Sequence, residues 1–80
     1  MDDNSVMRRI NELAREEHEL FERDSRGGTT IADQERLRQL QMMLDQCWDL
    51  LRQRRALREF GFDPDEAEIR DPKTVKGYIG

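Results

Sequence analysis

Three charged residues stand where the helical pattern places apolar side chains. Glu17 lies among the apolar residues of the first helical segment, and Arg36 and Arg54 point to the inner side of the second. Because an unpaired buried charge costs several kcal/mol, such residues should be paired or lie at the edge of the packed zone. We expect Glu17 and Arg36 to form an inner-face ion pair that fixes the alignment of two helices. The alternative is an anion or substrate pocket lined by Arg36, Arg54 and Glu17.

A basic cluster ends the second helical segment. It consists of four arginines: Arg52, Arg54, Arg55 and Arg58. Positive charge near a helix C-terminus interacts favourably with the helix dipole, and the same residues could contact an anion, a partner protein or a nucleic acid. Asp49 and Glu59 flank the cluster and the net charge of the chain is −4, which disfavours nucleic acid as a partner.

The other reactive side chains form no recognisable site. His18 lacks the Glu-x-x-His spacing of di-iron bundles. Asp45 and Asp49 lie opposite the apolar residues, where we expect both to be solvated, with Arg52 as a helical ion-pair partner. Cys47 has no His or Lys placed to activate its thiol and is expected to be a small buried hydrophobe. We therefore predict no catalytic, cofactor-binding or metal-binding residue, and a protein that is not an enzyme.

The composition is that of one small, surface-rich domain. The chain has 80 residues, of which 35% are hydrophobic and 40% are charged. A domain of this size usually needs a disulfide, a metal or self-association, and a single cysteine excludes an internal disulfide. No apolar run has membrane-spanning length, and the opening MDDNSVMRR lacks the apolar core of a signal peptide. We expect a cytoplasmic protein without membrane contact.

Two helical segments must position the charged residues. We expect them at about residues 5–24 and 30–60, joined into an antiparallel hairpin that occupies residues 1–61. Ser5 is the expected first N-cap, and Thr30 with Asp33 is the second. The sequence DSRGG ends the first helix and Gly61 ends the second, because glycine adopts positive φ without strain.

Residues 62–80 are predicted to be an irregular, Pro-containing tail that packs on the hairpin or on its partner. We expect one or two helical turns at 64–69 and an extended chain beyond them. Apolar residues recur through the tail, which argues against disorder: Phe62, Ile69, Val75, Tyr78 and Ile79.

The second helical segment carries two adjacent apolar stripes, more than one neighbouring helix would cover. We predict that this surface forms an interface between two copies of the chain. The predicted interface residues are Leu40, Met43, Leu44, Cys47, Trp48, Leu50, Leu51 and Leu57. The expected fold class is therefore all-α: an antiparallel helical hairpin with a long second helix and an irregular tail, dimerising into a four-helix bundle.

Two stretches carry a resemblance to known proteins. The segment 44–80, with its closing GYIG, and RRINELAREEHEL at 8–20 resemble a family of small actinobacterial proteins known only as a domain of unknown function, numbered 2630. The resemblance implies an all-helical bacterial protein of about this size and transfers no functional residue. Asp49 to Phe60 is also similar to the Arg-rich first helix of helical chorismate mutases, which form small intertwined helical dimers, but no catalytic role is carried across.

These observations leave the function unknown and favour one class. The prediction is a small helical protein–protein interaction or regulatory module that acts as a homodimer and binds an unidentified protein partner. The alternatives are a small helical enzyme with an Arg/Glu anion pocket, in the manner of a chorismate mutase, and weak nucleic-acid association through Arg52 to Arg58.

Overall fold

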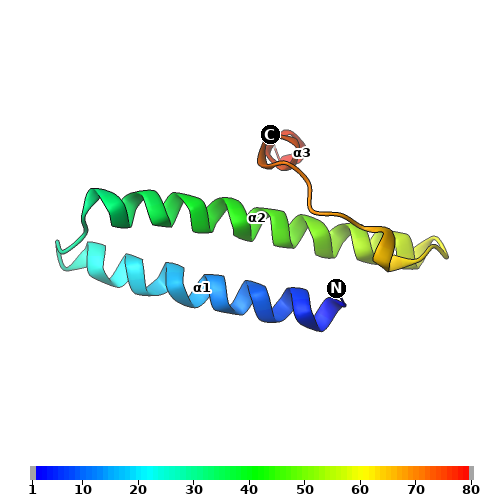
Figure 1. Cartoon of the computed structure of the whole chain (residues 1–80), viewed down its shortest axis with the longest axis horizontal. Coiled ribbons are helices and arrows are strands. Elements are labelled where there is room, and N and C mark those ends of the chain that lie inside the picture. Colours follow the sequence, from blue (N-terminus) through cyan, green and yellow to red (C-terminus); the bar gives the residue numbers. More distant parts are fainter. Residues whose placement is uncertain (1, 80) are drawn as a thin grey trace.

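The fold is all-α, as predicted. A computed structural model describes residues 2–79, and the side chains of residues 2–75. Its elements are α1 (Asp3–Ser25), α2 (Ile31–Glu59), the 3-10 turn η1 (Pro64–Glu66) and α3 (Pro72–Ile79), and no strand occurs within residues 2–79. Helices α1 and α2 run antiparallel, side by side, and form the predicted hairpin (Figure 1).

Capping residues and glycines set the ends of the two long helices. Helix α1 begins two residues earlier than expected, because Asp2 rather than Ser5 is its N-cap and accepts the Ser5 N–H at 2.7 Å. Thr30 and Asp33 form the capping box that begins α2. Gly27 and Gly61 have φ of 73° and 80° and stop α1 and α2 respectively. Local sequence signals therefore define the hairpin.

A narrow core lies between the two helices. Its buried members are Val6, Ile10, Leu13, Leu20, Leu40, Cys47 and Leu50. With 23 and 29 residues, α1 and α2 span about 34 and 43 Å. The end of α2 therefore extends beyond the start of α1, and the 3-10 turn η1 of the tail packs against α2.

The tail is less irregular than predicted. After η1, residues 67–71 form neither helix nor strand, but the chain then forms α3 where an extended chain was predicted. The helix starts because Pro72 occupies its first position and Asp71 accepts the Lys73 N–H at 2.8 Å. Figure 1 shows the tail returning along the side of α2 that faces away from α1. The side chains of Tyr78 and Ile79 lie outside the described residues.

The helices and the tail form a single layer. The chain measures 49 × 25 × 15 Å, with a radius of gyration of 14.9 Å, whereas a compact domain of this length has a radius of gyration of about 12 Å. The shortest dimension is little more than the diameter of one helix, about 10–12 Å. The layer therefore has two broad sides, which lie toward and away from the viewer in Figure 1.

Candidate functional site

One broad side of the layer carries apolar residues at seven-residue spacing on each long helix. We call it the broad apolar face and define it by Met7, Ala14 and Phe21 of α1 and Leu37, Leu44, Trp48 and Leu51 of α2. On both helices the stripe advances by seven residues, the spacing of helices that pack lengthwise against neighbours. Met7, Phe21 and Trp48 are 37%, 46% and 46% exposed. No described residue covers this face fully.

A groove of about 630 Å³ opens within this face, near the start of α1. Met7, Trp48 and Leu51 line it, which places the stripes of α1 and α2 on the same side of the layer. Four charged side chains complete the lining: Asp3, Asp45, Arg52 and Arg55. The groove has the size of a small-ligand or side-chain site, with an apolar floor and charged edges.

The opposite broad side carries two ion pairs between α1 and α2. Glu16 and Arg23 come two residues after Ala14 and Phe21, hence roughly 160° around α1 from the broad apolar face. Glu16 receives two hydrogen bonds from Arg36, at 2.5 and 3.1 Å, and Arg23 lies 3.5 Å from Asp33. The two sides of α1 therefore differ in polarity.

The partner of Arg36 differs from the prediction. Arg36 pairs with Glu16, whose pKa is lowered by hydrogen bonds from the Arg36 guanidinium, and the pair lies at the exposed edge of the hairpin. Glu17, one residue and ~100° further round α1, is half-buried and forms no ion pair with a described residue. The predicted inner-face pair Glu17–Arg36 was wrong by one position.

The eight predicted interface residues divide into three groups. Leu40, Cys47 and Leu50 are buried in the hairpin core itself, and Met43 packs against that core. Leu44, Trp48 and Leu51 belong to the broad apolar face, where Leu44 and Leu51 also pack against the core. Leu57 lies half-buried beside Phe60 and Phe62. Burial raises the pKa of the Cys47 thiol, which opposes nucleophilic use of this residue. Contact of these residues with a second copy stays a prediction.

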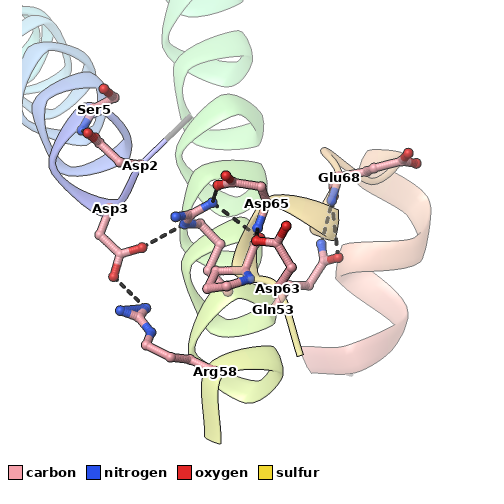
Figure 2. A network of polar contacts seen from close by, with 10 residues as sticks. Asp2, Asp3, Ser5, Gln53, Arg58, Asp63, Asp65 and Glu68 are labelled. Carbon is pink, nitrogen blue, oxygen red and sulfur yellow. Dashed lines mark hydrogen bonds and ion pairs between the residues drawn. The ribbon is translucent and has the colours of Figure 1, made fainter. Parts of the chain in front are cut away.

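The arginine cluster is largely engaged within the chain. Arg54, whose side chain is 8% exposed, donates to Asp3 at 2.6 Å, to Asp65 at 2.9 Å and to the Pro64 carbonyl at 3.2 Å. Arg58 binds the other oxygen of Asp3 at 2.6 Å. Figure 2 shows this network joining the start of α1, the end of α2 and the start of the tail. Hydrogen bonding from Arg54 lowers the pKa of Asp3.

Only half of the cluster remains open to a partner. Arg52 and Arg55 are exposed, and neither forms a hydrogen bond or an ion pair with a residue that the structure describes. Both line the groove of the broad apolar face. The predicted contact surface at Arg52, Arg54, Arg55 and Arg58 thus reduces to Arg52 and Arg55.

The predicted anion pocket does not form. Arg36 and Arg54 are 18 residues apart on one unbroken helix, which separates their backbones by about 27 Å. Each is already paired with carboxylates at its own end of the hairpin. A single small-molecule site cannot contain both.

The sequence analysis missed a polar site under the tail. Asp49, predicted to be solvated and paired with Arg52, is 5% exposed in its side chain and accepts two hydrogen bonds from Arg70, at 2.7 and 2.9 Å. Gln53 donates to Asp49 and to the Glu68 carbonyl, and Gln46 donates to the Arg70 carbonyl at 3.0 Å. We call Gln46, Asp49 and Gln53 the tail-binding residues.

The spacing of the tail-binding residues was the signal in the sequence that could have identified this site. Positions 46, 49 and 53 lie on one face of α2, and a tail containing an arginine returns beside them. Burial opposes ionisation of Asp49, but the hydrogen bonds from Arg70 and Gln53 outweigh it and lower the pKa of the carboxyl.

The remaining candidates are ordinary surface features. His18 lies 3.1 Å from Glu22, one turn away, and is exposed. Among the side chains that the structure describes, no three His, Cys, Asp or Glu residues cluster as metal ligands. None of the described helices combines the length and apolar character needed to cross a membrane.

Comparison with known proteins identifies a family but no assigned activity. Residues 2–80 match the family described as "Protein of unknown function (DUF2630)". The uncharacterised proteins Rv0898c of Mycobacterium tuberculosis H37Rv and Mb0922c of Mycobacterium bovis are each 46% identical over 79 residues, which is 98% of this chain and 91% of theirs. No solved structure matches the chain. The chain therefore belongs to the DUF2630 family of proteins of unknown function.

Proposed function

We propose that this protein is a cytoplasmic, non-enzymatic protein–protein interaction module that acts as a homodimer through its broad apolar face. The observation that carries the proposal is the contrast between the two sides of the layer. One side bears exposed Met7, Phe21 and Trp48, and the other bears ion pairs. Cys47 is a free, buried thiol, which is compatible with a reducing compartment.

The surface area supports the need for a second layer. Domains normally consist of two or more packed layers around one core. The chain exposes 5959 Å², whereas a folded monomer of its mass exposes about 5,100 Å². The excess of about 900 Å² is close to the roughly 800 Å² that each partner buries in an interface of standard size. A second copy on the broad apolar face would complete a four-helix bundle.

The alternative functions receive less support. The separation of Arg36 from Arg54 removes the pocket on which a mutase-like enzyme depended. Nucleic-acid association loses Arg54 and Arg58, whose charges are matched by Asp3 and Asp65. The interaction module remains the function that the geometry supports best.

Light scattering or sedimentation velocity on the full chain tests the proposal. We expect a dimer at micromolar concentration, and we expect Trp48→Ala to raise the dissociation constant at least about 30-fold, because a central tryptophan at an interface typically contributes 2 kcal/mol or more. Phe60→Ala is the matched control, since Phe60 is an exposed aromatic residue outside the broad apolar face. A chain that stays monomeric at high concentration, or equal effects of the two substitutions, would refute the proposal.

A further inference from the structure

We propose that the two copies stack broad face to broad face, antiparallel, about a two-fold axis that passes beside Ala14 and Leu44. This inference rests on the proposed function and deepens it by naming the arrangement of the partner. A two-fold axis requires a surface that is complementary to itself. The broad apolar face meets this requirement in its spacing, its shape and its charge.

The two stripes have midpoints at nearly the same height in the hairpin. Ala14 lies seven residues from both Met7 and Phe21, and Leu44 lies seven residues from both Leu37 and Leu51. Asp3 is beside Arg54 at one end of the hairpin and Arg23 is beside Asp33 at the other. Interpolation between these two contacts places Ala14 opposite the turn of α2 that contains Leu44. A two-fold axis at this height therefore places each stripe over the same stripe of the partner copy, running in the opposite direction.

The reversal pairs large side chains with open space. It places Met7 of one copy opposite the partner's Phe21, and Leu37 opposite the partner's Leu51, about 10 Å from the axis. The groove lined by Met7, Trp48 and Leu51 holds about 630 Å³ and would receive the ring of the partner's Phe21. Ala14, the smallest member of the stripe, meets its own copy, where a small side chain lets two helices approach closely. The arrangement thus explains why an exposed phenylalanine and an open groove lie at opposite ends of one face.

Charge selects the antiparallel arrangement over a parallel one. Arg52 and Arg55 lie at the open end of the face, where Asp3 and Asp45 also line the groove, and the half-buried Glu17 lies toward the turn. Parallel stacking would bring the arginines of both copies to one end and both Glu17 side chains to the other. Antiparallel stacking separates Arg52 and Arg55 of one copy from the same residues of its partner, which favours this register.

Single cysteines in a Cys47→Ala background test the arrangement. Facing helices 8–10 Å apart bring residues on the axis within disulfide reach, so Ala14→Cys should crosslink with its own copy under mild oxidation. Met7→Cys and Phe21→Cys should each remain uncrosslinked alone and should crosslink when mixed. A parallel stack, with α1 over the partner's α2, would instead crosslink a mixture of Met7→Cys and Trp48→Cys. Circular dichroism of each variant verifies that it folds.

The outcomes separate this inference from the proposed function. Crosslinking of Ala14→Cys, together with the Met7→Cys and Phe21→Cys mixture, supports the antiparallel stack. A dimer by light scattering that crosslinks only the Met7→Cys and Trp48→Cys mixture, or none of these variants, overturns the arrangement and leaves self-association standing. A monomer by light scattering overturns both.

Discussion

The pair formed by Asp49 and Arg70 should respond unequally to the loss of either partner. The Asp49 side chain is 5% exposed and the Arg70 side chain is 33% exposed. In Asp49→Ala the guanidinium can turn to water, so we expect a loss of about 1.5–3 kcal/mol, the range for hydrogen bonds to charged groups. In Arg70→Ala a carboxylate stays buried with Gln53 as its hydrogen-bond partner and Arg52 as the nearby positive charge. Removing one member of a buried pair in this way costs about 3–5 kcal/mol.

The loss of stability in Arg70→Ala cannot exceed the free energy of tail docking, because undocking of the tail gives Asp49 access to water. Two readouts are therefore needed. Urea unfolding followed by circular dichroism reports the whole hairpin, and hydrogen exchange of the Glu68 amide, which donates to Gln53, reports tail docking. We expect Glu68 to lose protection in both variants, and more in Arg70→Ala.

Substituting the buried acid supplies the control. In an Arg70→Ala background, Asp49→Asn removes the unpaired charge and should recover part of the lost protection. If Arg70→Ala and Asp49→Ala have equal effects below about 0.5 kcal/mol, or if Asp49→Asn gives no recovery, then burial does not govern this pair and the reasoning is refuted.

The remaining predictions concern the core and pH. Leu40 is fully buried, so Leu40→Ala should lower the free energy of unfolding by about 3–5 kcal/mol in a urea titration. Asp45→Ala should leave it nearly unchanged. Similar values for the two variants would contradict the assignment of the core face. Asp3, Glu16 and Asp49 have pKa values lowered from 3.8, 4.5 and 3.8, so the folded chain binds fewer protons than the unfolded chain near these values. The stability that these carboxylates contribute is complete above about pH 5.5 and is lost as the pH falls through the lowered pKa values. The urea midpoint should therefore stay level from pH 7 to ~5.5 and drop toward pH 3. A midpoint that rises on acidification would contradict this prediction.

The hairpin could be predicted from the sequence because its signals are local. Thr30 with Asp33 marks the start of α2, Gly61 marks its end, and apolar residues at helical spacing mark the faces. The ion pairs could not be assigned in the same way. A shift of one residue turns a side chain by ~100°, so the choice between Glu16 and Glu17 as the partner of Arg36 depended on the crossing geometry of the two helices.

The absence of a shared Arg36–Arg54 pocket could have been predicted from the sequence. The 18-residue interval between Arg36 and Arg54 alone places them too far apart for a shared pocket. The burial of Asp49 is different, since it depends on where the tail returns after Pro64, and no local pattern fixes that path. To predict α3, Asp71 and Pro72 had to be recognised as a helix start, whereas the chain beyond residue 69 was expected to be extended.

The manner in which α2 holds the tail bears on how freely the tail sequence can change. Gln46 and Gln53 bind the main chain at Arg70 and Glu68, and every residue type offers the same carbonyl oxygen. Glu66, Glu68 and Ile69 point their side chains largely into solvent. These three positions can therefore change among related chains without moving the tail, so long as Arg70 is retained. Different side chains can then occupy this edge of α2 while the backbone stays the same.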